Sequence, residues 1–139
     1  MKYLKKGNKY VVRIDKGEEV IEQIRKICMQ NNIKAGSISG IGATDRVKLG
    51  LFNTNTKNYM SKELTGSYEI VSMIGNISTM KDEVYLHIHI GVSNENMNLF
   101  GGHLNYCYIS ATCELIIEEI GLDVDRKYND EIGLNLYNI

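Results

Sequence analysis

Residues 86–104 read LHIHIGVSNENMNLFGGHL and contain all 3 histidines of the chain. Apolar residues alternate with His87 and His89, and this period of two is typical of a β-strand. The two histidines therefore share one face of the strand, and the apolar residues occupy the other. The polar run from Ser93 to Asn98 follows and predicts the loop of a β-hairpin.

A hairpin symmetric about Asn96 would place His103, the third histidine, directly opposite His89. Side chains opposite each other in an antiparallel pair share a face, with Cβ atoms ~5 Å apart. The glycine pair at 101–102 could add a β-bulge and change this register. In the symmetric register the three imidazoles converge on one point.

Three neutral imidazoles are a complete set of protein ligands for a divalent transition metal. Zinc bound by three histidines keeps a fourth position open for water or substrate. The alternative is that each histidine is satisfied separately, in the core or in solvent. Because the hairpin brings the third histidine to the first two, we predict that His87, His89 and His103 bind a divalent transition metal, with zinc as the first candidate.

The rest of the chain predicts further strands and one helix. Apolar and β-branched runs predict strands at residues 10–14, 35–43, 47–52, 68–77 and 108–120. Apolar residues recur at helical spacing from Glu18 to Asn31, after a capping box with Asp15 as the N-cap. The tail from Asp123 is predicted as a loop with a turn of helix. We therefore predict one domain, residues 1–139, of the α+β (α/β) class: a mostly antiparallel β-sheet with helix cover.

The charge distribution bears on nucleic-acid binding. A net charge of −1 argues against a general attraction to DNA. The N-terminal segment is nonetheless basic, through Lys2, Lys5, Lys6, Lys9, Arg13 and Lys16. Such an edge could contact phosphates, but lysines on a first strand more often block edge-to-edge pairing. The predicted helix begins with Glu18, Glu19 and Glu22, which phosphates would repel.

Other features concern the cellular compartment. No apolar run approaches the ~20 residues that span a membrane, and the N-terminal residues lack the apolar core of a signal peptide. Cys28, Cys107 and Cys113 include no C-x-x-C pair, which favours buried, reduced thiols. We therefore predict a cytoplasmic protein.

The histidine segments belong to a wider set of short motifs. The set comprises Leu86–His89, Gly101–Leu104, Ala111–Leu115, Tyr68–Ile70, Gly75–Ile77 and Gly40–Ala43, with Arg126 and Gly133–Leu134 as weaker members. Together these motifs resemble the PPC domain that plants and prokaryotes share, over nearly the whole chain.

The resemblance implies an α/β fold with an antiparallel sheet, a homotrimer, and a metal site formed by His87, His89 and His103. Prokaryotic relatives commonly consist of this domain alone and are named as candidate DNA-binding proteins with a PD1-like motif. Plant relatives contact DNA through a separate AT-hook of the Arg-Gly-Arg-Pro type. This chain contains no proline and no such motif, and so lacks that means of binding DNA.

The leading hypothesis is a homotrimeric PPC-domain protein with a three-histidine metal site and an unassigned small ligand or reaction. An open metal position can acidify bound water, and an enzyme would also want a general base. Glu69 and Glu114 are candidates for that base, although such carboxylates are more commonly exposed or cap helices. Whether the protein is an enzyme stays open. The alternative is a DNA-binding or regulatory protein that contacts phosphates through residues 1–16.

Overall fold

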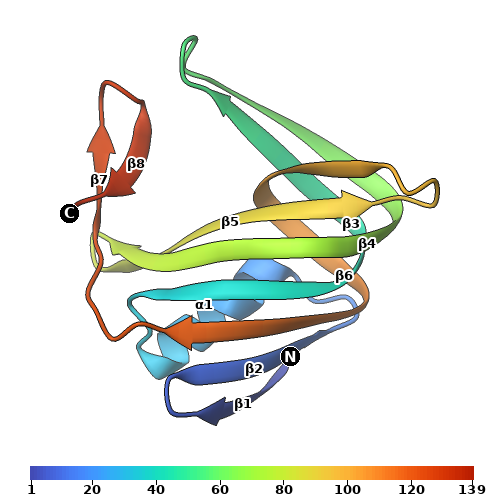
Figure 1. The fold of residues 1–139 in the computed structure, drawn as a ribbon, viewed down its shortest axis with the longest axis horizontal. Helices are drawn as coiled ribbons and strands as arrows, with labels where there is room; N and C mark the ends of the chain where they lie inside the picture. Colours follow the sequence, from blue (N-terminus) through green and yellow to red (C-terminus); the bar gives the residue numbers. More distant parts are fainter.

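Long antiparallel strands make up most of the protein. The computed structural model describes residues 1–139 (Figure 1). Its elements are β1 (Lys2–Lys6), β2 (Lys9–Asp15), α1 (Val20–Asn31), β3 (Gly36–Asn53), β4 (Asn58–Met80), β5 (Glu83–Ser93), β6 (Leu99–Glu119), β7 (Arg126–Asn129) and β8 (Leu134–Tyr137).

The main sheet closes on itself. Its strand order is β1-β2-β6-β3-β4-β5, and β5 pairs in addition with β6, so that β3, β4, β5 and β6 form a closed ring. All pairings in this ring are antiparallel. The register of β3 shifts between Gly40 and Gly42 and again between Thr44 and Arg46. Such irregularities bend a strand and increase its twist, which helps the ring to close.

The expected α+β (α/β) class with helix cover is wrong. Strands account for 68% of the residues and helix for 9%. Of the 23 residues of the hydrophobic core, 18 lie on strands and 4 on the helix, so the strands themselves supply most of the core. Helix α1 packs against the sheet through Val20, Ile24 and Ile27, which are fully buried, but it covers the sheet only locally. The tail also differs from expectation, because it forms the β7–β8 hairpin.

Helix α1 begins later than the sequence predicted. Its N-cap is Glu19, whose carboxylate accepts hydrogen bonds from two amides of the first turn, at 3.1 and 2.8 Å. The predicted N-cap, Asp15, is instead the last residue of β2. Glu18 accepts a hydrogen bond from the Asp15 amide at 2.9 Å. A capping box at Asp15 would need two contacts: the Asp15 side chain capping the helix, and the Glu18 side chain accepting from the Asp15 amide. Only the contact made by Glu18 forms.

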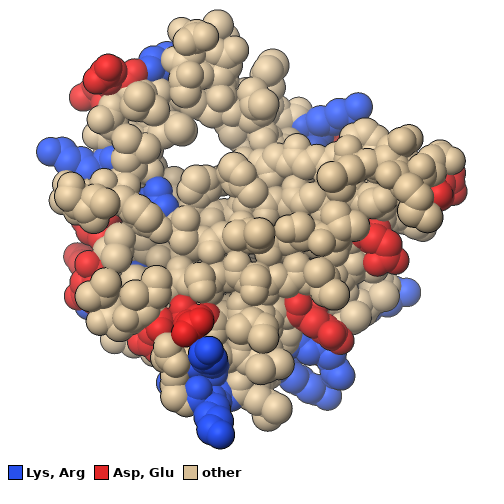
Figure 2. Space-filling view, in the orientation of Figure 1, with Lys and Arg blue, Asp and Glu red and all other residues tan.

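Two hairpins extend from the ring (Figure 1), and side chains near their tips are in contact. One is the outer part of β3 and β4, and the other is β7–β8. Lys57 Nζ donates a hydrogen bond to the Glu131 carbonyl, and a Cβ added at Gly133 would lie 3.1 Å from the Phe52 ring. Figure 2 shows the opening that these two hairpins and β5 enclose.

The cysteines are buried and unpaired, as predicted. Burial raises the pKa of Cys28, Cys107 and Cys113 to about 12. Their thiols are therefore protonated at neutral pH and are poor nucleophiles. The structure contains no helix with the length and apolar character that crossing a membrane requires.

Candidate metal centre

The β5–β6 hairpin has the register that the sequence predicted. His89 lies opposite His103, and the pairing continues without a shift to the end of β5. The side-chain oxygen of Asn94 organises the loop, because it accepts hydrogen bonds from two loop amides, both at 3.0 Å. The glycine pair introduces no bulge here. Gly102 instead allows β3 to pass closely, since an added Cβ would lie 2.7 Å from the Gly50 carbonyl oxygen.

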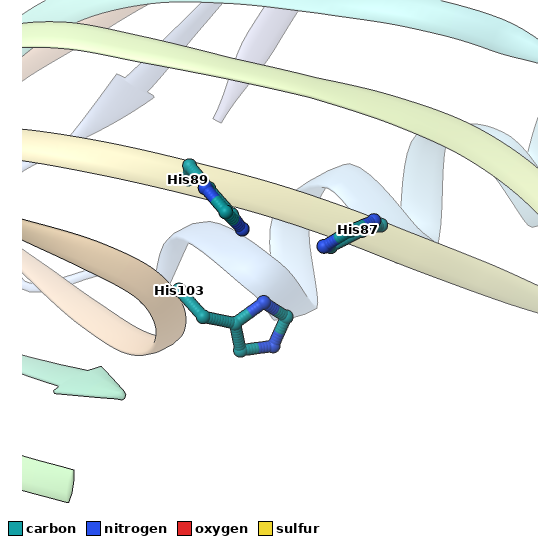
Figure 3. Close-up of side chains that lie close together, drawn as sticks. All are labelled: His87, His89 and His103. Carbon is teal, nitrogen blue, oxygen red and sulfur yellow. The ribbon is translucent and has the colours of Figure 1, made fainter. Parts of the chain in front are cut away.

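The three imidazoles converge on one side of this hairpin (Figure 3). One candidate ligand nitrogen from each ring lies within 4.8 Å of the others, and the ring centroids are 5.1, 5.3 and 5.7 Å apart. Tetrahedral zinc with bonds of ~2.1 Å holds its ligand nitrogens ~3.4 Å apart. Small side-chain rotations would therefore bring the set onto one ion. Between His87 and His89, Ile88 is fully buried and anchors the strand.

Burial favours the neutral form of two of the imidazoles, those of His87 and His103. Burial, with smaller contributions from His103, His89 and Arg126, lowers the pKa of His87 to about 4. Burial and the neighbouring His89 also lower the pKa of His103. A neutral imidazole offers a lone pair to a metal, whereas a protonated one has none. At neutral pH both histidines are therefore in the form that binds a metal.

A buried arginine lies on the β4 side of His87. Arg126, from β7, donates from Nη2 to Asn76 Oδ1 at 2.8 Å, and Asn76 is the register partner of His87. The guanidinium also lies over the rings of Tyr85 and Tyr137, at 4.7 and 4.4 Å from their centroids. In the sequence, Arg126 and Asn76 stand out only as parts of family motifs, because no local pattern places the tail beside β4.

A tyrosine borders the opposite side of the cluster. The ring of Tyr59, on the outer part of β4, meets the His103 ring edge-on, with centroids 6.3 Å apart. Its hydroxyl accepts a hydrogen bond from Asn105 Nδ2 at 2.6 Å. Tyr59 could not be found from the sequence, because only the pairing of β3 with both β4 and β6 brings it to the hairpin.

The two carboxylates considered as general bases lie elsewhere. Glu69 is opposite Ser93 in β5, and Ser93 is separated from His89 by about 13 Å of extended strand. Glu114 is opposite Arg13 in β2. Both are exposed, and neither belongs to the histidine cluster.

Fold and site together define a β-rich protein with a three-histidine cluster on one β-hairpin. The Plants and Prokaryotes Conserved (PCC) domain matches residues 1–121, and the chain belongs to this family. The family membership confirms the resemblance identified from the motifs. A search of curated proteins gives no match.

Solved structures share the fold over almost the whole chain. A candidate DNA-binding protein from Bacteroides thetaiotaomicron is 37% identical, with a TM-score of 0.96 over 99% of this chain and 96% of that one. A plant- and prokaryote-conserved (PPC) protein from Pyrococcus horikoshii is 34% identical, with a TM-score of 0.87 over 96% and 92%. A metal-containing protein from Archaeoglobus fulgidus is 29% identical, with a TM-score of 0.87 over 94% and 93%.

Proposed function

We propose that this PCC-domain protein binds one divalent transition metal ion per chain through His87, His89 and His103. The observation that carries the proposal is the convergence of one nitrogen from each ring within 4.8 Å. The similarity to a protein described as metal-containing supports it. Imidazole suits zinc and its neighbours in the transition series, and a bound zinc would polarise a ligand at its open position.

Elemental analysis tests this proposal. Purified wild-type protein, stripped with a chelator and reloaded with zinc, should retain about one metal ion per chain. The variant in which all three histidines are alanine should retain none. Glu69→Gln, which changes an exposed carboxylate outside the cluster, is the matched control and should bind metal like the wild type. Equal metal content in the wild type and the triple variant would refute the site.

Self-association as a homotrimer is a second part of the proposal. It rests on the family resemblance and on an exposed apolar patch formed by Val71, Ile74 and Leu99. These residues lie on β4 and at the start of β6, on either side of Gly91. A Cβ added at Gly91 would lie 3.6 Å from both Leu99 and Val71. Contiguous exposed apolar surface is typical of a protein–protein interface.

DNA binding is the alternative function. It is supported by the description of a relative as a candidate DNA-binding protein and by exposed lysines on β1 and β2. In Figure 2 basic groups lie over these strands with acidic groups beside them. Lys9 Nζ is 3.7 Å from Glu118, and Arg13 Nε is 2.9 Å from Asp15. Because acidic neighbours offset part of the charge, this surface supports at most a weak, sequence-independent contact with phosphates.

A further inference from the structure

A buried positive charge lies beside the candidate metal centre without an acidic partner. Arg126 is only 7% exposed, and no ion pair in the structure includes it. Buried charges are ordinarily paired, because removing an ion from water costs several kcal/mol. An arginine buried without a carboxylate therefore leaves a net positive charge in this region.

The guanidinium is held by neutral groups. Its Nε donates to Ser78 Oγ at 2.7 Å, its Nη1 to the Asn135 carbonyl at 2.8 Å and its Nη2 to Asn76 Oδ1 at 2.8 Å. These contacts fix its position between β4 and the β7–β8 hairpin. None of them neutralises its charge.

The contact with Arg126 also fixes the orientation of the Asn76 side chain. A guanidinium can only donate hydrogen bonds, so the oxygen of the Asn76 amide must face Arg126. The amide nitrogen, Nδ2, then lies on the other branch, and no protein acceptor bonds to it. Asn76 is opposite His87, and residues opposite each other share a face with Cβ atoms ~5 Å apart. A polarised hydrogen-bond donor is thus held beside the first histidine.

A metal-loaded site would carry a net positive charge. Three neutral imidazoles leave the charge of a divalent ion uncompensated, and Arg126 adds a further positive charge. No carboxylate belongs to the cluster. An anionic ligand is what such a site binds best, because it pairs with the ion and also accepts the Asn76 hydrogen bond.

We propose that the open position of the metal takes an oxyanion, the carboxylate or phosphate group of a small ligand, which Asn76 Nδ2 hydrogen-bonds. Arg126 acts as a positioning residue that orients and polarises Asn76. This inference rests on the proposed metal site. Because His89 is exposed, a small ligand can reach this face of β5 from solvent.

The test uses the full-length protein loaded with cobalt(II), whose visible absorption reports changes at the metal. Sodium phosphate and sodium acetate are titrated separately, so that the two oxyanion classes are distinguished. At least one should change the spectrum saturably. Asn76→Asp keeps an acceptor for Arg126 but removes the donor, and Asn76→Leu removes both. Both variants should retain cobalt and bind the oxyanion about tenfold or more weakly.

Two further variants complete the design. Arg126→Lys keeps the charge but cannot form the same fork of hydrogen bonds, so it should also weaken oxyanion binding. Asn8→Leu, in the β1–β2 turn, is the control and should bind like the wild type. Unchanged oxyanion affinity in a cobalt-loaded Asn76→Asp variant, or no saturable response of the wild type to either oxyanion, would overturn the oxyanion proposal. Either result would leave the metal proposal standing. Failure of the wild type to bind cobalt would overturn the metal proposal as well.

Discussion

The lowered pKa of His87 makes the metal-free protein sensitive to acid. Its folded value of about 4 lies below the ordinary value of 6.5. Between these values the unfolded chain binds a proton at this position that the folded chain does not. The contribution to stability is therefore complete above the unfolded pKa and is lost as the pH falls through the window from 6.5 to 4.

We predict that this histidine accounts for about 1 kcal/mol of the stability lost by the metal-free protein between pH 7 and pH 4, after discounting for its partial exposure. Urea unfolding at several pH values, in the presence of a chelator, measures the loss. The His87→Ala variant is the comparison, because its free energy of unfolding should change less than that of the wild type between pH 7 and pH 4. Parallel curves for the two proteins would contradict the assignment.

At the scale of elements, the carboxylate of Glu19 links the start of helix α1 to the sheet. Glu19 caps the first turn, and its Oε1 also accepts a hydrogen bond from the Cys107 amide in β6 at 2.9 Å. It is 7% exposed, so it does not present its charge to phosphates as the sequence analysis assumed. Substitution removes the cap and leaves a buried amide unsatisfied.

Glu19→Ala should therefore lower the free energy of unfolding by about 2–4 kcal/mol, the sum of a lost cap and an unpaired buried donor. Glu22→Ala, in the same turn but exposed, should change it by less than about 0.5 kcal/mol. Urea denaturation followed by circular dichroism measures both. Similar values for the two variants would contradict the structural role of Glu19.

The sequence predicted the histidine hairpin and its register better than the fold class. The histidine hairpin could be predicted because alternation, loop chemistry and register are local, and these alone bring His89 opposite His103. The ring of strands could not, because it depends on pairings between distant segments, such as β3 with β6. The tail hairpin was missed for a similar reason. The positions of Arg126 and Tyr59 beside the histidines depend on tertiary contacts that leave no pattern in the neighbouring sequence.

At the scale of the whole molecule, the apolar patch around Gly91 predicts assembly. Size exclusion coupled to light scattering should give the mass of three chains at micromolar concentration. Lysine at both Val71 and Leu99, which are 48% and 65% exposed, should shift the protein to monomers, because it places charges in the interface. Met29→Lys, an exposed position on α1, is the control and should remain trimeric. A monomeric wild type would rule out the trimer.

The weak charge of the β1–β2 surface predicts little binding of duplex DNA at physiological salt. Binding at low salt should be independent of sequence, fall steeply as salt is added, and weaken when Lys2, Lys5 and Lys6 are changed to glutamine. Fluorescence titration of several unrelated duplexes, with Lys26→Gln as the control, measures this. Tight binding to one sequence that persists at physiological salt would favour the DNA-binding alternative.

We propose above that three histidines of one hairpin hold a metal ion. Anomalous scattering from a crystal of the zinc-loaded protein tests it most directly, with data collected on both sides of the zinc absorption edge. We predict one strong peak per chain, about 2.1 Å from a ring nitrogen of each of His87, His89 and His103. A zinc-loaded crystal with no peak among these rings, or with its zinc bound elsewhere on the chain, would contradict it.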